Sequence, residues 1–116
     1  MNHLHINVPN VKEAQLFFEH YFGFKQVYPD SPTLFLMDAS GFLLALDACG
    51  PGEDVAFPEW LHFGLCRNEP EWARSLYIQM KTDGVHLSEF RDSDTTVVFF
   101  CRSPGGYRIE VRGNKT

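Results

Sequence analysis

The sequence of 116 residues predicts an α+β fold in which one βαβββ module is followed in tandem by a second. Short runs that alternate apolar and polar residues indicate half-buried strands, and apolar residues spaced i, i+3, i+4, i+7 indicate helices. One strand pattern, one helix pattern and three further strand patterns occur in this order twice, and the second copy begins at His62, 59 residues after His3. A repeated supersecondary unit of this length predicts two modules within one domain.

The first module opens with the segment HLHINV, residues 3–8, whose alternation predicts a strand. Asn10 is the expected N-cap of the helix that follows, with Glu13 at the capping-box position. Gly23 is the expected C-terminal cap. The apolar stripe of this helix comprises Ala14, Phe17, Phe18 and Tyr21. Three more strands are predicted at residues 24–28, 33–38 and 42–47, separated by turn sequences.

The second module repeats this plan, beginning with a strand in WLHFGLC, residues 60–66. Asn68 is the expected N-cap of its helix, Glu71 the box residue, and Gly84 the residue that ends the helix. The stripe comprises Ala73, Leu76, Tyr77 and Met80. Strands are predicted at residues 85–90, 96–101 and 107–111. The predicted division is a module at about 1–48, a connector at about 49–59 that is rich in glycine, proline and acidic residues, and a module at about 60–113.

Composition excludes several classes of protein. The net charge of −5 argues against binding to nucleic acid or to an anionic membrane, since both require a basic surface. The first residues carry no signal-peptide pattern, and no apolar run reaches the roughly 20 residues of a membrane span. The three cysteines, Cys49, Cys66 and Cys101, are odd in number and widely spaced, so we expect a cytoplasmic protein without a disulfide framework.

The final predicted strand raises the question of function. Alternation places Tyr107, Ile109 and Val111 on one face and Glu110 on the other, and most such glutamates simply point into water. However, His3 and His62 occupy the same register in the two repeated strands. Two histidines and one carboxylate suit Fe(II), Mn(II), Ni(II) or Zn(II). His3, His62 and Glu110 are therefore either unrelated surface or core residues or the ligands of one metal site.

Several segments in this order resemble the vicinal oxygen chelate superfamily, which includes glyoxalase I, bleomycin-resistance proteins, extradiol dioxygenases and fosfomycin-resistance transferases. The resemblance is carried by HLHINVPN, YFGF, LHFGL, KTDGV and SPGGYRIEV, and it spans nearly the whole chain. The last segment departs from the family pattern D-P-D-G-x-x-x-E: Ser103 and Gly105 replace the two aspartates, while Pro104, Gly106 and Glu110 remain. The resemblance implies that the two modules form curved, cavity-enclosing mixed sheets.

The resemblance also implies metal ligands on the first and last strand of each module. Transferred to this chain, these ligands are His3, His62 and Glu110. The fourth position is Ala45, four residues after Gly41 as Glu110 is four after Gly106, and alanine cannot bind a metal. The implied site therefore holds a divalent ion (Fe, Mn, Ni or Zn) on three protein ligands and leaves open positions for a substrate.

Further residues on these faces are candidates for catalysis or substrate binding. Besides Glu110, the candidate catalytic residue is His5, which could carry a proton or could merely line the cavity. Arg108 could clamp an anionic substrate or could pair with an acid. Gly64 and Cys66 are small and leave room for a ligand, and Ala45 would mark an open side of the site.

These observations favour a divalent-metal-dependent enzyme that acts on a small, chelating, partly apolar substrate. The missing fourth ligand weighs against glyoxalase I itself, and the reaction stays open among lyase, isomerase, dioxygenase and transferase chemistry. The alternative is a metal-free protein that binds or sequesters a small molecule, as bleomycin-resistance proteins do. The family pairs its modules within one chain or across two chains, and open sheet edges favour a homodimer.

Overall fold

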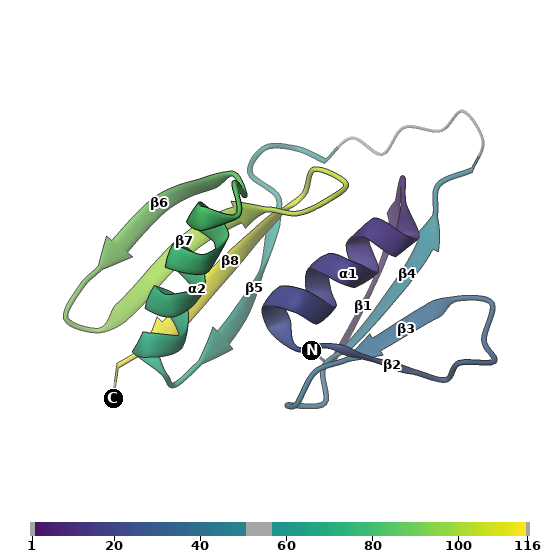
Figure 1. Ribbon diagram of the computed structural model, residues 1–116, viewed down its shortest axis with the longest axis horizontal. Helices are drawn as coiled ribbons and strands as arrows, with labels where there is room; N and C mark the ends of the chain where they lie inside the picture. The colour runs from purple at the N-terminus through teal and green to yellow at the C-terminus, as the bar shows by residue number, and fades with distance from the viewer. Residues whose placement is uncertain (1, 51–56, 116) are drawn as a thin grey trace. The chain divides into compact units, whose positions relative to one another are not determined.

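The computed structural model describes residues 2–50 and 57–115 (Figure 1). The chain divides into two compact units, Met1–Ala56 and Phe57–Thr116. Each unit contains one helix and one four-stranded mixed sheet. Residues 51–56 of the predicted connector lie outside the described residues.

The first unit has the predicted βαβββ order. Its elements are β1 (His3–Val8), α1 (Val11–Phe22), β2 (Lys25–Val27), β3 (Leu34–Met37) and β4 (Leu43–Ala48). The strands lie in the order β1-β4-β3-β2, with β1 parallel to β4 and the other pairs antiparallel. The sheet is mixed because α1 carries the chain back to the same end of the sheet before the three-stranded meander begins.

The second unit repeats this order and topology. Its elements are β5 (His62–Arg67), α2 (Pro70–Thr82), β6 (Leu87–Asp92), β7 (Thr96–Arg102) and β8 (Arg108–Asn114). The strands lie in the order β5-β8-β7-β6, with β5 parallel to β8. The predicted pair of βαβββ modules is therefore present in the chain.

The start of the first helix is as predicted and the start of the second is not. In α1, Asn10 Oδ1 accepts a hydrogen bond from the Glu13 amide at 3.0 Å. In α2 the N-cap is Glu69 rather than Asn68, and its side chain makes no capping bond. The reason is Pro70: proline lacks an amide hydrogen and has a φ suited to the first helical position, so the helix begins there.

The ends of the helices use glycine, as expected. Gly23 caps α1 in the left-handed conformation with φ +69°. Gly84, with φ +80°, follows Asp83, the C-cap of α2. At both glycines the chain leaves the helix through a left-handed backbone conformation, which most other residues adopt only with strain.

Each helix buries an apolar stripe, and both stripes differ from prediction at a tyrosine. Tyr21 and Tyr77 are only half-buried, because each ring reaches the edge of its helix face. The buried residues are Ala14, Phe17, Phe18 and Phe22 in α1, and Ala73, Leu76 and Met80 in α2. Phe22 belongs to the first core because it packs against Phe18, which also contacts Phe24 just beyond the helix.

In the second unit, α2 covers one face of the sheet and packs along β7 and β8 (Figure 1). Ile109 and Val111 of β8 point to this face and are fully buried, as is Phe99 of β7. Glu110 lies between Ile109 and Val111, so alternation places it on the opposite face. The predicted division of this strand into a packed side and a polar side is therefore observed.

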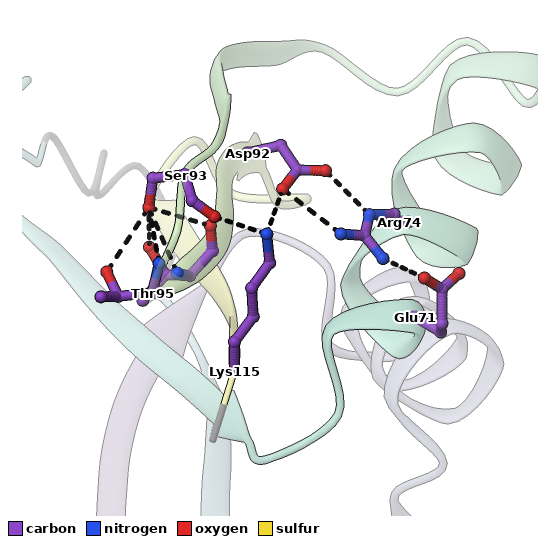
Figure 2. Close-up of polar contacts among 7 residues, drawn as sticks. Glu71, Arg74, Asp92, Ser93, Thr95 and Lys115 are labelled. Atoms are coloured by element: carbon purple, nitrogen blue, oxygen red, sulfur yellow. Dashed lines mark hydrogen bonds and ion pairs between the residues drawn. The ribbon is translucent and has the colours of Figure 1, made fainter.

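Polar contacts tie α2 to the hairpin between β6 and β7 (Figure 2). Arg74 of α2 donates to Asp92 at 2.8 Å and also pairs with Glu71. Lys115 donates to the same Asp92 carboxylate at 2.7 Å. Hydrogen bonds from these two cations lower the pKa of Asp92 to about 2.

The predicted strands differ from the observed ones mainly at their ends, and the largest shift is in β6. This strand was expected at residues 85–90 and occupies Leu87–Asp92. Its pairing with β7 shifts register between Ser88 and Arg91, and Glu89 there has φ +57°. A bulge of this kind inserts an extra residue and turns a side chain in a new direction.

None of the described helices has the length and apolar character that crossing a membrane requires.

Candidate functional site

His62 and Glu110 lie together on the polar face of the second sheet. The parallel pairing of β5 with β8 sets Gly64 opposite Glu110 and His62 opposite Arg108. The His62 Nε2 atom is 3.7 Å from Glu110 Oε1, which is longer than a hydrogen bond. Two of the three predicted metal ligands therefore converge without bonding directly to each other.

The surroundings of His62 hold its ring in one orientation. Its Nδ1 atom lies 3.2 Å from the carbonyl oxygen of Trp60, so Nδ1 carries the hydrogen and donates it. The lone pair is then on Nε2, the atom nearer to Glu110. The ring also packs edge-on against Phe100, with centroids 4.9 Å apart and planes at 89°.

The lack of a side chain at Gly64 of β5 leaves space beside the carboxylate of Glu110. A methyl group built on Gly64 would lie 3.7 Å from Glu110 Oε2, so an alanine would rest against the carboxylate. Cys66, the next residue on this face, is exposed as a residue, but partial burial of its thiol and the nearby Glu110 charge raise the pKa of Cys66. Cys66 is therefore a neutral wall of this face at physiological pH.

Arg108 is held by contacts within its own unit. Its Nη2 donates to Glu89 Oε2 at 3.0 Å, its Nη1 donates to the carbonyl oxygen of Glu59 at 3.2 Å, and its guanidinium lies 4.3 Å from the ring centre of Phe100. Of the two predicted roles, these contacts match pairing with an acid. The bulge at Glu89 turns that acid toward Arg108.

Glu110 also has a charged neighbour in Arg112, two residues later on the same face. The Arg112 Nη1 atom lies 3.6 Å from Glu110 Oε2. The side chain of Glu110 is 20% exposed, so the carboxylate is neither fully buried nor alone. The carboxylate of Glu110 therefore lies between a histidine and an arginine.

In the first unit, His5 forms a short hydrogen-bonded pair with Asp47. The His5 Nε2 atom lies 2.6 Å from Asp47 Oδ2, and the Thr33 hydroxyl donates to the same oxygen at 3.2 Å. Because the carboxylate accepts the Nε2 hydrogen, Nδ1 of the neutral ring keeps a lone pair. The carboxylate therefore fixes the orientation of the His5 ring.

Ala45 takes the position in β4 that Glu110 takes in β8. It pairs with His5 across β1 and β4, as Glu110 pairs with Gly64 across β5 and β8. The correspondence obtained by counting from the turn glycines is therefore confirmed by strand register. Ala45 itself is 7% exposed and also pairs with Phe35.

His3, the third predicted ligand, lies at the start of β1 in the first unit. Its Nδ1 atom is 2.9 Å from Asn2 Oδ1. Within residues 2–50 and 57–115, no three His, Cys, Asp or Glu side chains gather in a cluster suited to a metal ion. The role of His3 stays a prediction from the repeat.

Sequence reasoning missed three charged residues that lie beside candidate residues of their own unit: Asp47 beside His5, Glu89 beside Arg108, and Arg112 beside Glu110. Asp47 follows Ala45 by two residues and Arg112 follows Glu110 by two, so strand alternation could have placed both on the candidate faces. Glu89 could not have been found in this way, because the bulge interrupts the alternation of β6.

Comparison with known proteins agrees with this fold. The model of the Glyoxalase/Bleomycin resistance protein/Dioxygenase superfamily matches residues 1–111. A possible glyoxalase from Bacillus cereus is 28% identical, with a TM-score of 0.80 and 96% of each chain covered. No curated protein gave a significant sequence match.

Two more distant structures share the fold. A fosfomycin resistance protein from Listeria monocytogenes is 13% identical, with a TM-score of 0.77 and coverage of 97% of this chain and 91% of its own. A lactoylglutathione lyase from Agrobacterium tumefaciens is 15% identical, with a TM-score of 0.73 and coverage of 97% and 92%. The predicted fold class is confirmed, and the chain belongs to the Glyoxalase/Bleomycin resistance protein/Dioxygenase superfamily.

Proposed function

We propose that this protein is a divalent-metal-dependent enzyme of the vicinal oxygen chelate type, in which His62, Glu110 and His3 bind the ion. The observation that carries the proposal is the approach of His62 Nε2 to Glu110 Oε1 at 3.7 Å on an open sheet face. His3 enters the proposal as the residue that occupies the same place in β1 as His62 occupies in β5.

The donor atoms fit a metal in chemistry and in spacing. Two ligands about 2.1 Å from one ion, at angles of about 90–120°, are separated by about 3.0–3.6 Å. The observed 3.7 Å is close to this range and exceeds the length of a hydrogen bond. In addition, His62 Nδ1 donates to the Trp60 carbonyl oxygen, with 3.2 Å between the nitrogen and the oxygen, and metal-binding histidines usually make a contact of this kind.

The side chains around this pair suggest how a small ligand is received. Gly64 leaves the carboxylate of Glu110 open, and Phe100 supplies an apolar surface beside His62. A divalent ion bound there would act as a Lewis acid toward an oxygen of a chelating substrate. His5, oriented by Asp47, is the residue we propose to carry a proton, which agrees with its candidate catalytic role.

Metal titration of variants tests the proposal. Mn(II), Ni(II), Fe(II) and Zn(II) are added separately to chelator-treated wild type, Glu110→Gln and His62→Ala, and binding is measured by calorimetry. Loss of one ligand should weaken binding of at least one of these ions by about tenfold or more. His86→Ala is the matched control, since His86 is an exposed histidine of the same unit and its loss should leave affinity unchanged. The proposal fails if wild type binds no ion more tightly than either ligand variant.

A metal-free small-molecule-binding protein is the second candidate, and Arg112 favours it. Its guanidinium supplies a positive charge 3.6 Å from Glu110 Oε2, so the carboxylate has a partner without a bound cation. In that case Glu110 is a polar wall of a binding pocket, and chelator treatment should leave ligand affinity unchanged. The metal-dependent enzyme should instead lose both activity and ligand affinity when its ion is removed.

A further inference from the structure

An open pocket of about 240 Å³ lies on the polar face of the second sheet, beside the candidate metal ligands. Its walls are Arg91, Ser93, Thr96, Val98, Glu110 and Arg112. Val98 of β7 pairs with Arg91 of β6 on one side and with Arg112 of β8 on the other. One arginine therefore lies on each side of the buried Val98, on the neighbouring strand about 5 Å away.

The positive charge of this pocket is only partly neutralised. Within the described residues, the side chain of Arg91 makes no hydrogen bond or ion pair. Asp92, its neighbour in the chain, is bound to Arg74 and Lys115 (Figure 2). The negative charge of Asp92 is therefore paired with Arg74 and Lys115 and does not neutralise the positive charge of Arg91.

Arg112 also keeps donors for a ligand. Its Nε donates to Asn114 Oδ1 at 3.2 Å, and Nη1 lies 3.6 Å from Glu110 Oε2, beyond hydrogen-bond length. A guanidinium has five N–H donors, so its terminal groups retain capacity. The Thr96 hydroxyl adds a further donor, since its contact with Ser93 Oγ is a weak one at 3.4 Å.

We propose that Arg91 and Arg112 form a binding site for an oxyanion, a carboxylate or a phosphate group, at one end of a small ligand. Guanidinium groups bind both oxyanions through paired, charge-assisted hydrogen bonds. The volume of 240 Å³ is below the roughly 300–1,000 Å³ that encloses a drug-sized ligand, so the pocket fits one group rather than a whole molecule. Val98 forms its apolar floor.

The position of Glu110 at the edge of the pocket then defines the substrate class. A ligand whose oxyanion group is bound by Arg91 and Arg112 would extend its other atoms toward Glu110 and His62. This step rests on the proposed function, and it describes a substrate with metal-chelating oxygens at one end and a negatively charged group at the other.

Anion titration of chelator-treated protein tests the site without any metal. Inorganic phosphate and malonate are titrated separately at constant ionic strength, and binding is followed by amide and arginine Nε signals in ¹H–¹⁵N spectra. Wild type should bind at least one probe saturably, with a Kd on the order of millimolar. Arg91→Gln and Arg112→Gln should each weaken that binding by about tenfold, the factor that one charge-assisted hydrogen bond supplies.

Arg67→Gln is the charge-matched control, because Arg67 packs over Trp72 at 4.5 Å and does not line the pocket. It should bind anions as wild type does. The probe that binds more tightly identifies the preferred oxyanion. The inference is overturned if neither probe saturates below about 50 mM, or if Arg91→Gln, whose exposed side chain the fold does not need, binds as wild type does. Because no metal is present, this failure is distinct from a failure of the metal site.

Discussion

Gly113 allows the first turn of α2 to lie directly against β8, and its replacement by alanine should destabilise the second unit. A methyl group at Gly113 would lie 2.8 Å from the Glu69 carbonyl oxygen, 2.9 Å from Pro70 Cα and 3.1 Å from Ala73 Cβ. The first two are backbone atoms at the start of the helix and cannot swing aside. The helix must therefore shift away from Val111 and its neighbours, which are fully buried.

Overpacking of this kind costs about 1–3 kcal/mol in the free energy of unfolding. Gly64→Ala is the matched control: the substitution is the same and lies in the same sheet, but the nearest atoms to the new methyl are 3.7 Å away. Since alanine has fewer unfolded conformations than glycine, we expect Gly64→Ala to be neutral or to stabilise by up to about 1 kcal/mol.

Urea denaturation followed by tryptophan fluorescence measures the difference. Both tryptophans, Trp60 and Trp72, lie in the second unit, so the signal reports on this unit. For a slope of about 2 kcal/mol/M, Gly113→Ala should lower the midpoint by about 0.5–2 M relative to Gly64→Ala. Equal midpoints for the two variants would refute the argument that close packing of α2 on β8 requires glycine.

Asp92 should stabilise the protein above about pH 4, since Arg74 and Lys115 lower its folded-state pKa to about 2 from an ordinary value of 3.8. The stability difference between wild type and Asp92→Asn in urea melts should therefore be largest near pH 6 and shrink as the pH falls through about 2, and a difference as large at pH 2 as at pH 6 would contradict this. Burial raises the pKa of Cys101 to about 12, and the pKa of Cys66 is also raised, so an aromatic disulfide reagent at pH 7.5 should modify Cys66 slowly and Cys101 only on unfolding. Rapid modification of both Cys66 and Cys101 in the folded protein would contradict the raised pKa values of the two thiols. Sedimentation equilibrium at micromolar concentration should give twice the 13.3 kDa chain mass, as expected for a homodimer, and a stable monomer would rule the dimer out.

The order of elements was predictable from the sequence because both periodicities are strong and occur twice. The repeat is more regular than the predicted caps suggested: the observed N-caps, Asn10 and Glu69, are separated by the same 59 residues as His3 and His62. Asn68 looked like a cap because of its residue type. Pro70 was the stronger signal, since proline favours the first position of a helix.

The candidate site was only partly predictable, because its contacts join residues distant in sequence. Register within the repeat was sufficient to bring Glu110 opposite Gly64 and near His62. The pairing of His5 with Asp47 depends on the side-chain conformations of two residues that are 42 positions apart in the sequence. The partner of Arg108 depends on the bulge at Glu89, and local sequence patterns do not specify where a bulge will occur.

Anomalous diffraction would show whether His62 and Glu110 bind a divalent ion. Crystals grown separately with Mn(II), Fe(II), Ni(II) and Zn(II) would each be measured above and below the absorption edge of the added metal. We expect an anomalous peak about 2.0–2.3 Å from both His62 Nε2 and a carboxylate oxygen of Glu110. A map with no peak there, in which His62 Nε2 still faces Glu110 Oε1 without an ion between them and Arg112 remains the only cation beside the carboxylate, would contradict the claim.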